Sequence, residues 1–328
     1  MSEPILMQSR NIYAQQAHNR RMSWCIVGCI MILFAVIGLG FDYYYLGIFN
    51  TRIEIPIATI IALVLSILFA LWSLQGGASA VLLSAQAVPA DPNNPDQHQL
   101  LNVVQEISLA SGLPAPKVYI IPDDDPNAFA TGKDPQHSSI AITRGLLATL
   151  ERDELQAVIA HEMSHIRYYD IRFMTLVTAC VGAIVLLADI SLRGLRFGFL
   201  SGRGMRSKEK NPLGIVLLVL WLLTALLAPI LTRLMAMTIS RKREYLADAS
   251  AAELTRNPLA LAKALQKLEN ASAPTVTIKR GIAHLCVVDP LGKKVNEKEG
   301  FWAELFATHP PIQNRIMLLK SMAYQYPR

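Results

Sequence analysis

Two histidines one helical turn apart are the part of this sequence best suited to chemistry. The segment reads His161-Glu162-Met163-Ser164-His165. Side chains four residues apart on a helix project from one face, so both imidazoles can bind a single metal ion, and Glu162 can reach a water on it. Zinc with an open fourth position lowers the pKa of its water to about 7 and polarises a carbonyl. The HExxH pattern therefore predicts a zinc site for peptide hydrolysis.

The residues before the motif are compatible with a helix that would present it. Residues 153–160 contain no Pro or Gly, and apolar residues recur at helical spacing. Asp153 and Glu154 stand near the expected start, where the helix dipole favours negative charge. The competing interpretation is a pair of solvated histidines on an ordinary amphipathic helix.

A second helical pair supplies a candidate for the remaining ligand, since catalytic zinc needs three protein ligands and one open position. Glu244 and Asp248 are four residues apart. Glu244 would complete a His, His, Glu set, and Asp248 could then accept the second ring N–H of a ligand histidine and fix its tautomer. The alternative is a solvated charged helix face, because residues 241–243 are all basic. Spacing alone does not decide between the two.

In combination these motifs resemble the HtpX heat-shock membrane metalloproteases, which belong with the CaaX prenyl endopeptidases in one broader family. The resemblance is carried by HEMSH, an apolar segment, then SRKREYLADASA at 240–251 and THPPIQNRI at 308–316. It covers roughly residues 100–319 plus an N-terminal hairpin of two apolar segments. The first 23 residues and the connection 193–210 depart from the family pattern, which affects expectations about topology and regulation but not about chemistry.

The resemblance implies a role for each matching residue. His161, His165 and Glu244 would be zinc ligands, Glu162 the base, and Asp248 the Asp that follows the third ligand in the family. His309 would donate to the developing oxyanion, and Arg315 would hold the local geometry or pair with an acidic group near the metal. The alternative for this last pair is a capping histidine and a solvated arginine. An edge strand over the active site, which binds substrate, would contain Asn127, Ala128, Phe129 and Ala130.

Composition indicates a membrane protein rather than a soluble enzyme. Hydrophobic residues make up 52% of the 328, and the mean hydropathy is positive, at +0.32. Four uncharged runs account for this: 24–41, 55–74, 173–188 and 213–232. About 20 apolar residues span a hydrocarbon core, so the first, second and fourth runs are good spans and the third is short.

The basic residues next to the runs predict orientation. Arg10, Arg20 and Arg21 precede the first run, whereas the loop before the second carries only Arg52. The N-terminus and residues 76–170 are therefore expected in the cytoplasm. If the last two runs both span, the loop between them places six cations outside, which fits the rule poorly. The alternative is a helical hairpin packed from the cytoplasmic side; we favour two spans because the fourth run is long and apolar.

These observations predict a mainly α membrane protein with a zincin-like α+β catalytic domain: an HExxH helix and a small sheet with an edge strand. The chain is expected to begin with a cytoplasmic N-terminal segment (1–23) and a transmembrane hairpin (24–75). The first part of the catalytic domain (76–170), two further apolar segments, expected as transmembrane spans, with a basic connection (171–232), and the second part of the catalytic domain (233–328) would follow. Expected helices cover 97–110, 249–254, 258–269 and 313–324, and expected strands cover 117–121, 127–131 and 139–143.

The predicted activity is that of a zinc endopeptidase with one Zn²⁺ per chain. The resemblance implies that it works in the bacterial inner membrane and cleaves misfolded or damaged membrane proteins in quality control. Its partners would be unfolded polypeptides and the lipid bilayer, with a homo-oligomer or a regulatory membrane partner left open. Nucleic-acid binding is not expected, because the cations behind the net charge of +6 flank apolar runs. Two alternatives are a prenyl-protein endopeptidase, for which four runs are few, and a non-catalytic zinc-bound scaffold, which the presence of Glu162 argues against.

Overall fold

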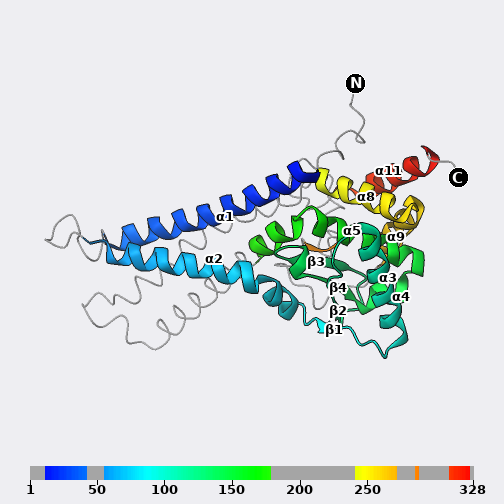
Figure 1. The fold of residues 1–328 in the computed structure, drawn as a ribbon, viewed down its shortest axis with the longest axis horizontal. Coiled ribbons are helices and arrows are strands. Elements are labelled where there is room, and N and C mark those ends of the chain that lie inside the picture. Colours follow the sequence, from blue (N-terminus) through cyan, green and yellow to red (C-terminus); the bar gives the residue numbers. More distant parts are fainter. Residues whose placement is uncertain (1–11, 43–54, 179–240, 272–284, 288–309, 326–328) are drawn as a thin grey trace, which may run out of the picture.

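The computed structural model describes residues 12–42, 55–178, 241–271, 285–287 and 310–325. Within this part the protein is mostly helical, with one small mixed sheet (Figure 1). Two long helices form a hairpin that projects from a body in which the sheet and the remaining helices pack together. His309 and the fourth apolar run lie outside the described residues, as does most of the third run.

The projecting hairpin consists of α1 (Ile12–Phe41) and α2 (Ile57–Ser84), which contain the first apolar run and nearly all of the second. Asp42 ties the two helices together, because its carboxylate accepts hydrogen bonds from the first backbone amides of α2, Ala58 N at 2.8 Å and Thr59 N at 2.9 Å. Of the described helices, α2 is long and apolar enough to cross a membrane, judged by length and composition. A crossing by α1 stays a prediction.

The sheet has the strand order β1-β2-β4-β3, which places β3 at an edge of the described sheet. The strands are β1 (Val88–Pro89), β2 (Lys117–Ile121), β3 (Ala128–Gly132) and β4 (Ser138–Thr143). Strand β2 runs parallel to β4, whereas β1 pairs with β2 and β3 with β4 in antiparallel fashion. Short apolar and β-branched runs bounded by Pro, Asp and Gly explain these strands.

Helices cover the sheet and close the body. In chain order, the helices of the body are α3 (Pro95–Ser111), the 3₁₀ turn η3 (Pro135–His137), α4 (Arg144–Thr149), α5 (Arg152–Arg167), α8 (Arg241–Thr255), α9 (Pro258–Asn270) and α11 (Ile312–Gln325). A further helical stretch covers residues 170–178. Helix α3 starts where Asn94 accepts from two backbone amides and ends at Gly112, whose φ of 68° suits glycine.

The core lies between α3, the sheet and α5, where it holds α5 in place. Apolar residues of α3 such as Leu100 and Ile107, of β4 such as Ile140, and of α5 such as Ile159 and Met163 are buried in one cluster. Helices α9 and α11 close the same cluster from the other side of α5 through residues such as Leu265 and Leu319. Because α5 is packed on all these elements, the side chains that it presents are fixed in direction.

Candidate metal centre

Helix α5 presents the two histidines of the HExxH motif from a firmly anchored position. Its start is fixed by Glu154, whose carboxylate accepts from the backbone N–H of Glu151 at 2.9 Å and from Lys267 Nζ of α9 at 2.7 Å. Residues from His161 to Ile166 are all buried. The motif is therefore an interior feature of the body rather than a solvated helix face.

The structure brings together the three residues that were predicted as ligands. His161 Nε2 and His165 Nε2 are 3.2 Å apart, as expected for neighbouring turns of one helix. Glu244, from α8, places Oε2 3.7 Å from His161 Nε2 and Oε1 3.6 Å from His165 Nε2. One donor atom from each residue lies within 4.8 Å of the others, and all three side chains are buried.

The donor set fits a zinc ion. In a tetrahedron with zinc–nitrogen bonds of about 2.0–2.1 Å, neighbouring ligand atoms lie about 3.3 Å apart, close to the spacing of the two Nε2 atoms. Each histidine also has its other ring nitrogen against a carboxylate: His161 Nδ1 is 3.0 Å from Asp248 Oδ1, and His165 Nδ1 is 3.0 Å from Asp170 Oδ2. With the proton on Nδ1 in both rings, both Nε2 lone pairs are available to one metal.

Asp248 is itself held by Arg315, which α11 carries into the interior. Arg315 donates from Nε to Asp248 Oδ2 at 2.8 Å and from Nη2 to Asp248 Oδ1 at 2.7 Å. Its Nη1 lies 3.4 Å from Glu244 Oε2. Burial would raise the pKa of Asp248, but the charge and hydrogen bonds of Arg315, helped by His161, hold that pKa below its usual range. Arg315 is therefore not a solvated arginine, and it contacts an acidic group on each side of the site.

Asp170 is a residue of this site that the sequence did not suggest. It follows the end of α5, where Tyr168 and Tyr169 form a turn and Tyr169 has a φ of 62°. A positive φ is uncommon for a residue with a side chain, and here it redirects the chain so that Asp170 meets His165. The signal in the sequence was an acidic residue five positions after His165, but no helical spacing predicts that contact.

Acidic groups outnumber cationic ones around the two histidines. Four buried carboxylates, those of Glu162, Asp170, Glu244 and Asp248, face two guanidinium groups, Arg315 and Arg243. A divalent cation would balance the difference between these groups.

Glu162 and His165 bind protons more tightly in this environment, whereas burial lowers the pKa of His161. Burial raises the pKa of Glu162 to about 7, with Glu244 acting in the same direction against the opposing effect of His165. Burial alone would lower the pKa of His165, but the hydrogen bond to Asp170 and the charge of Glu244 raise it to about 9.

The predicted substrate strand lies next to this site. Asn127 pairs with Thr143 of β4, so alternation along the strand turns the backbone groups of Ala128, Ala130 and Gly132 to the outer edge of β3. There the backbone of Ala130 forms a hydrogen bond with Glu162.

Two backbone groups on the outer edge of β3 form hydrogen bonds with other parts of the chain. Val287 N donates to Ala128 O at 3.0 Å, and Gly132 N donates to Thr175 Oγ1 at 3.1 Å. The outer edge of β3 thus faces Glu162 and is partly occupied by hydrogen bonds within the chain itself.

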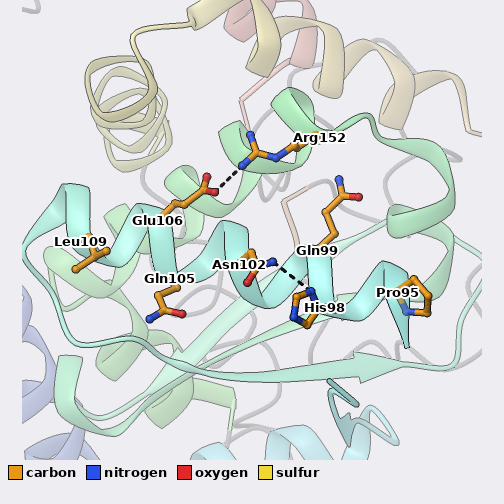
Figure 2. A pocket seen from close by; sticks show the side chains of 8 residues that line it. All are labelled: Pro95, His98, Gln99, Asn102, Gln105, Glu106, Leu109 and Arg152. Atoms are coloured by element: carbon orange, nitrogen blue, oxygen red, sulfur yellow. Dashed lines mark hydrogen bonds and ion pairs between the residues drawn. The ribbon is translucent and has the colours of Figure 1, made fainter. Parts of the chain in front are cut away.

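A separate hollow is lined by residues of α3 and by Arg152, and its lining includes none of His161, His165 and Glu244 (Figure 2). Its polar side chains contact one another: Arg152 contacts Glu106 at 2.5 Å, and His98 Nδ1 lies 3.2 Å from Asn102 Nδ2. The lining residues do not bring three metal donors together, so we place the chemistry at the buried cluster on α5 and α8.

Known proteins resemble this chain over most of its length. The model of peptidase family M48 matches residues 94–323. A protease HtpX homolog of Caldanaerobacter subterraneus is 43% identical over 96% of this chain and 99% of its own length, and one of Dictyoglomus turgidum is 41% identical over 98% of both. The crystal structure of S. mikatae Ste24p is 18% identical with a TM-score of 0.48, covering 94% of this chain and 66% of that one. This chain belongs to peptidase family M48 and is a membrane-bound metalloprotease.

Proposed function

We propose that the protein is a zinc endopeptidase in which His161, His165 and Glu244 hold the metal and Glu162 transfers protons. The observation that supports it most directly is the convergence of three buried donors from two helices. The Nε2 atoms of His161 and His165 lie 3.2 Å apart on α5, which also carries Glu162, and Glu244 comes from α8. Zinc, when bound, would lower the pKa of a water molecule to about 7 and polarise the carbonyl under attack.

Glu162 is suited to accept the proton that the attacking water loses. Its pKa of about 7 is close to neutral pH, so the carboxylate can take up a proton and then release it to the amine of the cleaved peptide bond. The hydrogen bond from the backbone of Ala130 limits the directions in which the carboxylate can turn. Glu162 therefore acts twice in one turnover, first as a base and then as an acid.

Arg315 and His309 complete the proposed machinery in different ways. Arg315 acts as a positioning residue, because it fixes Asp248 and thereby the ring of His161. His309 lies outside the described residues, and its proposed role as a hydrogen-bond donor to the oxyanion comes from the family resemblance.

The substrate is proposed to bind as an extended strand along the outer edge of β3. Backbone hydrogen bonds to Ala128 and Ala130 would supply affinity with little demand on sequence, as suits unfolded polypeptides. Val287 N, which donates to Ala128 O, would give way to the incoming strand. By resemblance to heat-shock membrane proteases, the substrates are misfolded or damaged membrane proteins, cleaved in quality control.

We further propose that the chain crosses the bacterial inner membrane several times and keeps its catalytic domain in the cytoplasm. Three arginines precede the first apolar run against one in the following loop, which favours a cytoplasmic N-terminus. Helix α2 has the length and composition of a membrane span, and the relatives compared above are bacterial.

The test uses the full chain, purified in detergent, with casein and a model membrane protein as substrates. Chelation should abolish cleavage and zinc should restore it. Glu162→Gln should keep zinc, because Glu162 is not a ligand, and lose about 10²–10⁴-fold in turnover. Glu244→Gln, which removes a proposed ligand from the facing helix, should lower zinc occupancy.

Normal turnover in the Glu162 variant would contradict the mechanism, and normal zinc content in the Glu244 variant would contradict the ligand set. Cleavage of a farnesylated peptide in preference to both protein substrates would instead favour a prenyl-protein endopeptidase.

A further inference from the structure

The N-terminal helix α1 reaches into the surroundings of the proposed metal site through one buried side chain. Asn19 donates from Nδ2 to Asp170 Oδ1 at 2.6 Å and to the backbone carbonyl of Tyr168 at 2.9 Å. Its side chain is fully enclosed, with 1% of the residue exposed. Asn19 lies in α1, five residues before the apolar run 24–41, and its hydrogen bonds place this part of the helix against the body.

The two oxygens of Asp170 connect different parts of the molecule. Oδ2 faces His165 Nδ1 at 3.0 Å, whereas Oδ1 accepts from Asn19 and lies 3.7 Å from Arg243 Nη1 of α8. A carboxylate held at both oxygens cannot rotate freely about its χ2 angle. The orientation of the His165 ring therefore depends on a donor that α1 contributes.

Two neighbouring contacts dock α1 on the turn that carries Asp170. Gln16, one turn earlier on α1, donates from Nε2 to the carbonyl of Arg167 at 2.8 Å. The guanidinium of Arg20 lies over the ring of Tyr169, 4.8 Å from its centroid. Neither contact involves Asp170 itself, so Gln16 offers a control for docking without positioning.

We propose that Asn19 is a positioning residue for zinc binding, acting on His165 through Asp170, so that the helix leading into the membrane is part of the metal site. This inference rests on the proposed function of His161, His165 and Glu244. Groups that orient a metal-bound histidine typically contribute about 10–100-fold to metal affinity. Separation or tilting of α1 would weaken the site from a distance.

The experiment measures zinc release from the full chain in detergent to a chromogenic chelator, with thermal unfolding of each metal-free variant measured alongside. Asn19→Leu, which removes the donor at similar volume, should weaken zinc binding about 10-fold or more. Gln16→Leu, which removes a donor from the same helix and the same docked turn, should leave zinc release near wild type. Equal effects of the two variants would show that only docking matters, and wild-type release in Asn19→Leu would overturn the proposal.

A double-mutant cycle tests whether Asn19 acts through Asp170. Asp170→Asn should itself speed zinc release, and adding Asn19→Leu should change the rate little further, because the relay is already broken. Additive effects would contradict the relay. If Asn19→Leu does not fold, Asp170→Asn alone decides: wild-type zinc release would overturn the proposal.

Replacing zinc with Co²⁺ reports the geometry of the ligands, because the visible absorption of Co²⁺ depends on its coordination. The spectrum should change in the Asn19 and Asp170 variants but not in Gln16→Leu. A wild-type protein that binds no zinc would instead contradict the proposed site itself.

Discussion

At the scale of single residues, the site depends on charges that are buried together. Arg315 contacts Asp248 with two hydrogen bonds and lies 3.4 Å from Glu244, and neither Arg315 nor Asp248 is exposed to solvent. Such a pair adds little net stability over an apolar substitute, but removal of one partner leaves the other charge buried alone. Arg315 is thus needed to compensate the buried negative charges of Asp248 and Glu244.

Arg315→Met is expected to destabilise the protein by about 3–5 kcal/mol, because Asp248 would keep its burial and lose its partner. Arg315→Lys should cost less but still weaken zinc binding, since an ammonium group cannot reproduce the two-pronged contact with Asp248. Chemical unfolding of the metal-free protein and zinc content measure the two effects. The double variant Arg315→Met with Asp248→Leu should recover much of the lost stability; failure to do so would show that another contact of Arg315 dominates.

His309→Ala is expected to lower turnover by about 10²–10³-fold, the usual loss of one oxyanion donor, with zinc content and thermal stability near wild type. A fourth protein ligand would fill the position that catalysis leaves open, which is why we do not expect His309 to bind zinc. Turnover, metal content and unfolding temperature distinguish an oxyanion donor from a structural residue or a zinc ligand. Unchanged turnover would remove His309 from the mechanism, and loss of zinc would identify it as structural or as a ligand.

Helical spacing and the family motifs predicted the three donors and a contact of Asp248 with one of the two histidines, which the structure identifies as His161. It did not predict Asp170, Asn19 or Arg243. The contact of Asp170 depends on the positive φ of Tyr169, and that of Asn19 on how α1 packs more than a hundred residues away in sequence. Local periodicity carries no information about such contacts.

At the scale of elements, strand β3 lies between the rest of the sheet and Glu162 of the candidate site. One of its edges pairs with β4, and the other faces Glu162 through Ala130. Short apolar runs between turn residues predicted the strands well: β2 has the expected bounds, and β3 and β4 are each shifted by one residue at one end or both. The order of the strands and the contact of Val287 with the outer edge were not predictable, because they depend on packing between distant segments.

If substrates add to β3 as a strand, N-methylation of successive peptide bonds in a good substrate should lower kcat/KM with a period of two. Only every second backbone amide of a strand points to a given neighbour, as Ala128, Ala130 and Gly132 do on the outer edge of β3. Steady-state kinetics on a set of peptides, each with one N-methyl group outside the scissile bond, gives the pattern. Control peptides carry the extra methyl group on a side chain instead of on the backbone nitrogen, which tests the effect of bulk alone. A fall in kcat/KM that does not alternate along the peptide would argue against strand addition.

At the scale of the whole molecule, two apolar runs interrupt the catalytic body. His161 precedes them and Glu244 follows them, yet the two side chains lie 3.7 Å apart. The chain between them must therefore cross the membrane an even number of times or not at all. Residues 179–240 lie outside the described part of the chain, so the choice rests on the sequence: the fourth run favours a span, and the cations between the runs oppose it.

Single cysteines in this connection decide between the two arrangements. Gly202→Cys and Met205→Cys, each on a background without the four native cysteines, would be treated in intact cells with an impermeant maleimide. We expect labelling, because two spans would place the connection outside the cell. Arg52→Cys, in the loop expected to be external, controls for labelling, and Leu109→Cys, on the exposed face of α3, controls for protection until the cells are permeabilised. Protection of positions 202 and 205 together with Leu109→Cys would instead show a hairpin held on the cytoplasmic side, where its six cations would lie close to the anionic lipid headgroups.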